Sequence, residues 1–280
     1  MIVDVHTHFW KLEEIGPEVY KDLEQARIPQ DHLAVKSDHH LLATAAVDKA
    51  VVFGLRALQS GFNISNDTVK EQVDKAPDRL IFFTSIDPTE VDFMGELERT
   101  HQDMGAKGIK LGPIYQGVHP LDDRYRMIYA YAQKHNLPIL THMATTFSSS
   151  APLDYANPLH MDEIAIDFPH LNFILAHLGH PWNGETISII RRHRNVFADI
   201  SALYYRPWQF YTAMRLLVEY GASHKVFFGS DYPFTLPKDS IEGVRNLNYI
   251  VREGSGLPLV PEDIIEEIIN RDTLGILGIQ

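Results

Sequence analysis

The sequence predicts an α/β protein whose strands close into a (β/α)8 barrel, the TIM-barrel architecture. Eight short apolar segments, rich in β-branched and aromatic residues, alternate with segments of helical periodicity. The apolar segments are nearly continuous, as in parallel strands that are covered on both faces. A length of 280 residues is normal for one such barrel. We therefore expect residues 1–280 to form a single domain.

The expected elements follow one another in regular order. The strands are predicted at residues 2–6, 50–54, 80–86, 108–111, 138–142, 172–177, 196–200 and 226–231. Helical patterns cover residues 38–46, 123–135, 161–168, 210–220 and 240–252, and residues 261–275 predict a terminal helix. Strands separated by helices indicate a parallel sheet, and eight of them indicate closure into a barrel.

The composition limits the residue types that could bind a metal and the kinds of partner that the chain could have. The chain has no cysteine, so metal ligands must be imidazoles and carboxylates, which suit zinc, manganese or iron. A formal net charge of -12 argues against nucleic acid or an anionic membrane as a partner. No apolar run approaches the ~20 residues of a membrane helix, and the amino terminus lacks a signal-peptide pattern. We expect a cytoplasmic protein with a small-molecule partner, and homo-oligomer formation stays open.

Four expected strands carry metal-ligand types at their carboxyl ends. The first ends in His6-Thr7-His8, and in a regular strand these two imidazoles project from the same face. His142, His177 and Asp231 close three later strands. The carboxyl ends of barrel strands converge on one mouth, so these side chains can meet there. A divalent ion held in this way keeps room for water, which is typical of a catalytic site.

Five motifs in this order resemble those of the amidohydrolase superfamily, in the amidohydrolase-related branch that includes aminocarboxymuconate-semialdehyde decarboxylase. They are DVHTH (residues 4–8), GIKL (108–111), TH (141–142), AHLG (176–179) and FGSDYP (228–233). The resemblance implies that His6, His8, His142 and Asp231 are metal ligands. It implies that His177 orients the metal-bound water, or ligates a second metal in binuclear members.

Lys110 ends the fourth expected strand, where some binuclear members of the superfamily carry a carbamylated lysine. We expect instead a lysine that pairs with the substrate or a neighbouring carboxylate, and hence one divalent ion. Zinc is the first expectation, with manganese or iron as alternatives. Asp231 and His177 are the expected catalytic residues, because they can take up and return protons beside the metal.

Other residues are expected to shape the substrate pocket. Arg56, Tyr115 and Trp182 follow the second, fourth and sixth expected strands. An arginine suits bidentate binding of a carboxylate, and an aromatic ring can wall an unsaturated acid. Residues 10–36, which begin with Trp10, are too long for an ordinary βα loop and are expected to fold over the barrel mouth. His32, His39 and His40, in the same connection, are expected to be exposed.

Two reactions fit these residues. In the first, metal-activated water hydrolyses a small carboxylated, lactone- or amide-type substrate. In the second, the metal anchors an unsaturated or aromatic carboxylic acid that undergoes non-oxidative decarboxylation. Lys110 and the modest chain length favour hydrolysis. A non-catalytic binding protein is disfavoured because every expected ligand position is occupied.

Overall fold

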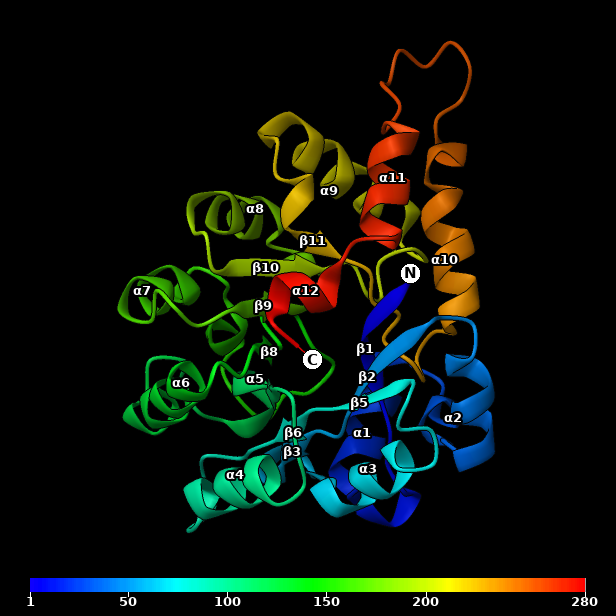
Figure 1. Cartoon of the computed structure of the whole chain (residues 1–280). Helices are drawn as coiled ribbons and strands as arrows, with labels where there is room; N and C mark the ends of the chain where they lie inside the picture. The colour runs from blue at the N-terminus through cyan, green and yellow to red at the C-terminus, as the bar shows by residue number, and fades with distance from the viewer. Residues whose placement is uncertain (280) are drawn as a thin grey trace.

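The barrel consists of eight parallel strands, one of which is interrupted (Figure 1). The computed structural model describes residues 1–279 without the side chain of His32, so the expectation for that residue lies outside the described part. The strands are β1 (Val3–His8), β2 (Lys49–Phe53), β5 (Leu80–Phe82) continued by β6 (Thr84–Ser85), β7 (Ile109–Leu111), β8 (Ile139–Thr141), β9 (Phe173–Leu175), β10 (Val196–Asp199) and β11 (Val226–Phe227).

Neighbouring strands pair in sequence order, and the last strand returns to the first. The pairs β1–β2–β5 and β6–β7–β8–β9–β10–β11 are all parallel. A parallel bridge between Thr7 and Tyr232, with a 2.8 Å hydrogen bond from the Asp231 amide to the His6 carbonyl, closes the ring. The predicted fold class is therefore confirmed, with strands shorter than expected at most ends.

Helices surround the strands and complete the α/β layers. They are α1 (Pro17–Ala26), α2 (Ser37–Thr44), α3 (Asn66–Val73), α4 (Phe93–Gln102), α5 (Pro113–Gln116), α6 (Asp123–His135), α7 (His160–Asp167), α8 (Asn183–Arg192), α9 (Pro207–Tyr220), α10 (Pro237–Arg245), α11 (Glu262–Ile269) and α12 (Thr273–Leu277). The predicted terminal helix is instead two helices, because α11 ends at its C-cap Asn270 and α12 begins after its N-cap Asp272.

Short elements connect these helices and strands. The antiparallel hairpin β3 (Arg56–Ala57) and β4 (Phe62–Asn63) follows β2. The 3-10 turns are η1 (Leu12–Glu14), η2 (Gln30–Leu33), η3 (Leu58–Ser60), η4 (Leu153–Ala156), η5 (Ala176–Gly179), η6 (Ser223–Lys225) and η7 (Leu247–Ile250). No helix within residues 1–279 is both long and apolar enough to cross a membrane.

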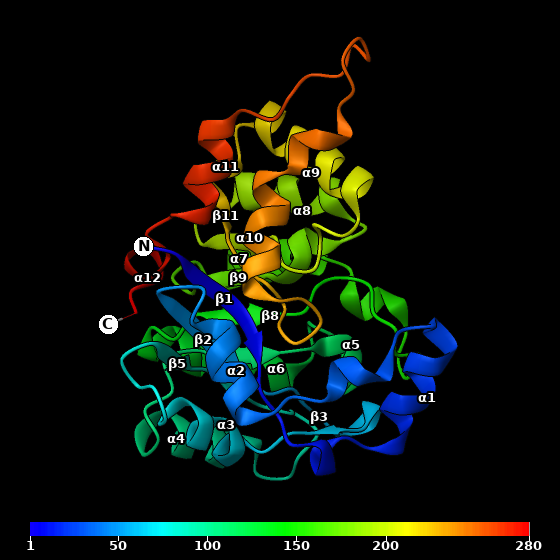
Figure 2. The same cartoon turned by 90° about the vertical axis from the view of Figure 1, so that its right-hand side faces the viewer.

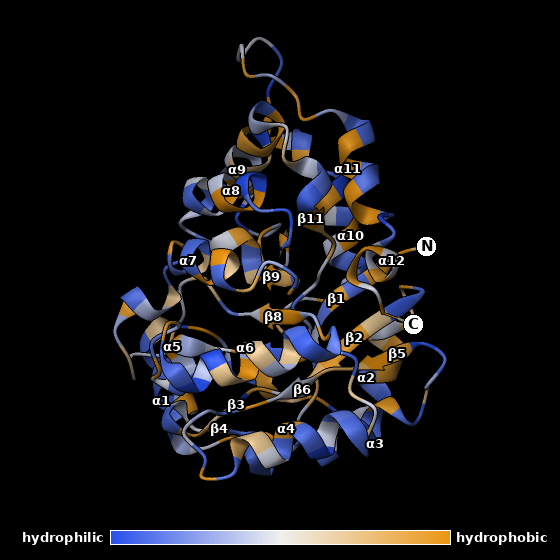
Figure 3. Cartoon of the chain, turned by 60° about the vertical axis from the view of Figure 1, so that its left-hand side comes forward, coloured by the Kyte–Doolittle hydropathy of each residue, from blue (hydrophilic) through white to orange (hydrophobic). Residues whose placement is uncertain are grey.

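Two apolar layers hold the fold together. The inner layer fills the barrel with residues such as Val5, Phe53 and Phe227, and Leu277 of α12 packs against it. The outer layer lies between strands and helices, and β5 and β8 have the hydrophobic colour in Figure 3. In Figure 2, α12 lies on the side where the chain begins and α1 on the opposite side, beyond the carboxyl end of β1.

His40 differs from its expected exposure. Its side chain is fully buried in α2, with its ring against Phe9 at 5.3 Å and Tyr232 at 5.5 Å. Its Nδ1 pairs with the side-chain amide of Gln72 at 3.2 Å. The expectation was wrong because α2 turns this face towards the residues that follow β1 and β11.

Candidate metal centre

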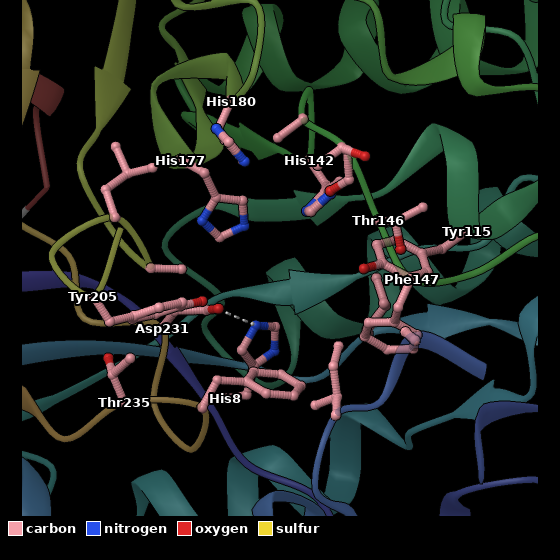
Figure 4. Close-up of a pocket in the computed structure, with 18 of the residues that line it drawn as sticks. His8, Tyr115, His142, Thr146, Phe147, His177, His180, Tyr205, Asp231 and Thr235 are labelled. Atoms are coloured by element: carbon pink, nitrogen blue, oxygen red, sulfur yellow. Dashed lines mark hydrogen bonds and ion pairs between the residues drawn. The ribbon is translucent and has the colours of Figure 1, made fainter. Parts of the chain in front are cut away.

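A pocket of about 600 Å³ opens at the carboxyl ends of the barrel strands (Figure 4). This volume lies in the range of ordinary small-molecule sites. Of the residues predicted for the site, the ones that line this pocket are Trp10, His8, Lys110, Tyr115, His142, His177 and Asp231. The long connection after β1 contributes Trp10 and residues 26–29 to the lining.

A bulge in β1 aims both histidines of His6-Thr7-His8 into the barrel. The pairing with β2 shifts by one residue, since Asp4 faces Ala50 while Thr7 faces Val52. Val5 packs in the inner layer, and strict alternation would have turned its neighbour His6 outwards. The extra residue reverses the alternation, so the ring of His6 also faces inwards, 5.1 Å from that of Phe53.

His6, His8 and Asp231 bring three ligand atoms together. The Nε2 atoms of His6 and His8 lie 3.2 Å and 3.4 Å from Oδ1 of Asp231, and Figure 4 marks the second contact. All three ligand atoms lie within 4.8 Å of one another. Asp231 has a left-handed backbone, with φ 72°, an uncommon conformation for a residue with a side chain. Such strain is typical of functional sites.

Asp199, at the end of β10, is a site residue that sequence reasoning missed. Its Oδ2 lies 2.9 Å from Nδ1 of His6, and its Oδ1 accepts the backbone N–H groups of His177 and Ser201 at 3.0 Å and 2.9 Å. The hydroxyl of Ser201 also donates to Oδ1. A ligand histidine commonly donates its second nitrogen to a carboxylate in this way. The signal available in the sequence was a carboxylate that closes the seventh strand.

These contacts favour the binding of a cation between His6, His8 and Asp231. Because His6 donates Nδ1–H to Asp199, its Nε2 carries the lone pair that faces Asp231. Burial, and next the charge of Lys110, lower the pKa of His6, while burial raises the pKa of Asp231. A divalent ion bound between these atoms would relieve the repulsion between the His6 lone pair and the Asp231 carboxylate. Nδ1 of His8 is buried without a hydrogen-bond partner among the described residues.

His142 and His177 also line the pocket, with ring centroids 5.0 Å apart, and the ring of His177 lies 4.8 Å from that of His6. Nε2 of His142 pairs with the Thr145 carbonyl at 3.2 Å, which leaves Nδ1 as its lone-pair atom. His142 is not part of the close group of three within residues 1–279. Nδ1 of His177 pairs with the Ser201 hydroxyl at 2.8 Å, and its backbone is left-handed at φ 57°. Burial lowers the pKa of both imidazoles, that of His142 to about 3.

Lys110, on β7, extends towards the candidate metal ligands. Its Nζ lies 3.4 Å from Nε2 of His6 and 4.6 Å from the centroid of the Phe53 ring. Burial lowers the pKa of Lys110 to about 8, although the charges of Asp199 and Asp231 oppose this effect. A cation at this position favours ionised carboxylates in the site.

Two residues expected to line the pocket lie elsewhere. The Arg56 guanidinium is carried by the β3–β4 hairpin to an ion pair with Glu90 and a hydrogen bond with Asn63. Trp182 precedes α8 and packs against the outer apolar layer. The pocket lining instead includes the cationic side chains of Arg27 and Arg206, after α1 and before α9.

Five aromatic rings form a closed circuit in the pocket wall. In order around the circuit, consecutive centroids lie 5.8–6.5 Å apart, and the rings belong to Trp10, Phe62, Tyr115, Phe147 and Phe234. The circuit contacts two of the candidate ligand histidines. The ring centroid of Trp10 lies 5.4 Å from that of His8, and the ring centroid of Tyr115 lies 4.9 Å from that of His142. A planar apolar group can therefore lie directly beside the candidate metal ligands.

Comparison with known proteins identifies the family of this chain. The amidohydrolase family model matches residues 3–265. The chain belongs to the amidohydrolase family. This amidohydrolase is thus an enzyme of a metal-dependent superfamily, and its three-residue group offers suitable metal ligands. No match was found among curated proteins.

Solved structures similar to this amidohydrolase share its fold at low identity. One is an uncharacterised TIM-barrel protein from Bordetella bronchiseptica, with 19% identity, TM-score 0.71 and 99% of each chain covered. A dihydroxybenzoic acid decarboxylase from Polaromonas with bound manganese and the inhibitor 2-nitroresorcinol has 15% identity and TM-score 0.69, covering 99% of this chain and 96% of its own. A probable 2-pyrone-4,6-dicarboxylic acid hydrolase from Acinetobacter baumannii, with citric acid bound, has 16% identity, TM-score 0.64 and 99% of each chain covered.

Proposed function

We propose that this amidohydrolase hydrolyses a small, planar, carboxylated lactone or amide with the help of one divalent metal ion. The observation that carries the proposal is the group of His6, His8 and Asp231 beside an aromatic-walled pocket. The polar group offers ligands for a metal, and the apolar walls offer a place for the rest of the substrate.

His6, His8, His142 and Asp231 would hold the ion, with zinc as the first expectation and manganese or iron as alternatives. A bound ion would act as a Lewis acid that lowers the pKa of water to about 7. The four candidates come from β1 and from the loops that follow β8 and β11. Asp199 supports the set by holding the ring of His6.

His177 and Asp231 are the proposed catalytic residues. Because Ser201 lies at Nδ1 of His177, the proposed tautomer keeps a lone pair on Nε2, which can accept a hydrogen bond from the attacking water and orient it. Burial keeps this imidazole neutral by lowering its pKa. Asp231 would take up the proton of this water as its oxygen bonds to the carbonyl carbon, and would deliver it to the leaving oxygen or nitrogen as the acyl bond breaks.

The pocket wall would select the substrate. Trp10 and Tyr115 are proposed to pack against its planar part, and Lys110 to attract its carboxylate. Arg206, whose guanidinium lies 4.4 Å from the centroid of the Tyr205 ring, is a second cation in the lining. Residues 26–29 come from the long connection after β1, which supports a role for residues 10–36 as a cover of the pocket.

Non-oxidative decarboxylation of an aromatic acid is the second candidate, and the aromatic circuit favours it. The five rings offer a stacking surface for a benzene-type ring beside the metal ligands. The structurally similar Polaromonas protein is a dihydroxybenzoic acid decarboxylase. In this reaction His177 or Asp231 would donate a proton to the ring carbon that loses carbon dioxide.

One experiment tests both reactions. The purified enzyme is incubated with lactones, amides and aromatic carboxylic acids, before and after metal removal, while ring opening, amide cleavage and carbon dioxide release are followed. Hydrolysis that disappears with the metal and returns with zinc would support the first proposal. Carbon dioxide release without hydrolysis would replace it with the second. Turnover that is independent of metal would contradict both.

A further inference from the structure

A second cluster of metal-ligand types lies outside the pocket. His119, in the connection between α5 and α6, faces Asp154 of η4 and His160, the first residue of α7. Their three potential ligand atoms lie within 4.8 Å of one another, and the two imidazole centroids are 4.5 Å apart. The proposed reaction does not use these residues.

The cluster has the same arrangement as the candidate metal centre. One carboxylate oxygen, Oδ2 of Asp154, lies 3.1 Å from Nε2 of His160 and 3.8 Å from Nε2 of His119. A tetrahedral zinc ion with bonds of about 2.0–2.1 Å separates its ligands by roughly 3.4 Å. The two observed separations bracket that value, so small rotations of the imidazoles would complete the geometry.

Solvent can reach the cluster. The side chains of His119 and His160 are 33% and 20% exposed, and that of Asp154 is 58% exposed. An ion could therefore enter from water and keep water in its remaining positions. Coordination through Nε2 of His160 would replace its 3.1 Å contacts with both the carboxylate and the backbone carbonyl of Asp154. Coordination through Nε2 of His119 would also release the Leu121 amide from Nδ1 of that ring, and Leu121 is partly exposed, so water can replace this contact.

We propose that His119, Asp154 and His160 form a second binding site, for a zinc-class divalent ion, which fastens the connection between β8 and α7. This connection carries pocket-lining residues 144–147 near its start and Asp154 near its end. Between them, the Ser150 carbonyl accepts a 2.6 Å hydrogen bond from Gln59, and Ser149 donates to Asp22 at 3.2 Å. An ion would add a link to His119, which follows α5 in the chain.

Zinc titration of the full chain tests the site. Tag-free enzyme that retains its resident metal is titrated with zinc sulfate, and bound zinc is measured by equilibrium dialysis with elemental analysis. We expect the parent to bind one further equivalent. His160→Gln and Asp154→Asn should each weaken this binding by at least the ~10-fold typical of losing even an outer partner. Zinc should also slow amide hydrogen exchange in residues 143–159 of the parent, but not of the two variants.

His135→Gln is the matched control, because this histidine also faces another imidazole, that of His101, with centroids 5.0 Å apart. We expect it to bind the further equivalent like the parent. The proposal would be overturned if the parent bound no further zinc, if His160→Gln bound it as tightly, or if His135→Gln weakened it equally. Resident metal is measured in the same samples, so failure of this second site leaves the proposed metal centre tested separately.

Discussion

Nδ1 of His6 and Oδ2 of Asp199 lie 2.9 Å apart although the two residues are 193 positions apart in the chain. Both side chains are fully buried, so water does not compete for this hydrogen bond. It places the proton of His6 on the side away from Asp231 and leaves a lone pair towards the candidate metal position. The end of β10 therefore determines how β1 presents its first ligand.

Replacing Asp199 should weaken metal binding. We expect Asp199→Asn to lower metal affinity by ~10–100-fold, because the amide no longer holds the correct tautomer of His6 as firmly. Competition with a chromogenic chelator measures the change. Asp162→Asn is the control, because this carboxylate also pairs with an imidazole, that of His193 at 2.6 Å, but neither residue lines the pocket. An Asp199→Asn enzyme that binds metal as tightly as the parent would contradict this role.

The proposed ligands can be tested directly by elemental analysis. Enzyme purified without chelator should contain about one tightly bound divalent ion. His6→Ala combined with His8→Ala should lose both the ion and the activity, because two of the three closest ligand atoms disappear. His101→Ala, a change on α4 away from the pocket, is the control. Full metal content and activity in the double variant would disprove the assignment.

The two proposed catalytic residues should differ in their effect on the metal. Asp231→Asn and His177→Asn should each reduce turnover by at least ~10²-fold, the usual contribution of acid–base groups. His177→Asn should retain most of the metal, because Nδ1 of His177 pairs with the Ser201 hydroxyl at 2.8 Å and its other nitrogen is proposed to face water rather than the ion. Kinetics and elemental analysis of the same preparation separate the two effects. Loss of the metal in His177→Asn would make His177 a ligand.

We expect the exposed side chains of residues 10–36 to affect substrate binding, and the buried ones to affect the free energy of unfolding. Trp10 is 1% exposed and donates a 2.8 Å hydrogen bond to the Leu33 carbonyl, so Trp10→Ala should cost about 3–5 kcal/mol in unfolding free energy. Arg27 lines the pocket with an exposed side chain. Arg27→Gln should raise KM for an anionic substrate and change stability by less than ~0.5 kcal/mol.

Chemical denaturation and steady-state kinetics of both variants provide the measurements. Arg27→Gln should leave KM for an uncharged substrate analogue unchanged, which is the internal control. If Arg27→Gln matches the parent on every anionic substrate, the residues after α1 do not contribute to substrate selection.

His40 should make the stability of the protein depend on pH. Burial, and next the charges of Arg79 and Lys75, lower its pKa from 6.5 to about 4 in the folded state. The unfolded chain then binds the additional proton between these values, so stability falls as the pH decreases from 6.5 to 4. The shift corresponds to about 3 kcal/mol at most. Urea unfolding at several pH values should show a smaller fall for His40→Leu than for the parent.

The neighbouring residue offers the control for this experiment. His39 lies on the exposed side of α2, so His39→Leu should keep the pH dependence of the parent. An identical pH dependence in parent and His40→Leu would show that the buried ring does not contribute.

The barrel could be predicted because its signals are local. Each strand is a continuous apolar segment, and each ligand type stands at the carboxyl end of its own segment, where the barrel topology gathers all such ends. The positions of His8, Lys110, His142, His177 and Asp231 in one pocket follow from this rule. The ligand roles and the single-domain organisation of residues 1–280 stay predictions.

Contacts between distant segments depended on the tertiary structure. The bulge that turns His6 inwards is set by pairing with β2, and Asp199 becomes its partner only after β10 and β1 meet in the barrel. Arg56 could not be separated from a pocket arginine by sequence, because its partner Glu90 lies 34 residues further along. The periodicity of the sequence indicates whether a residue is buried, but strand register and loop packing decide which residue it contacts. Register and loop packing depend on free-energy differences between whole arrangements of the chain, so no short segment of sequence determines them.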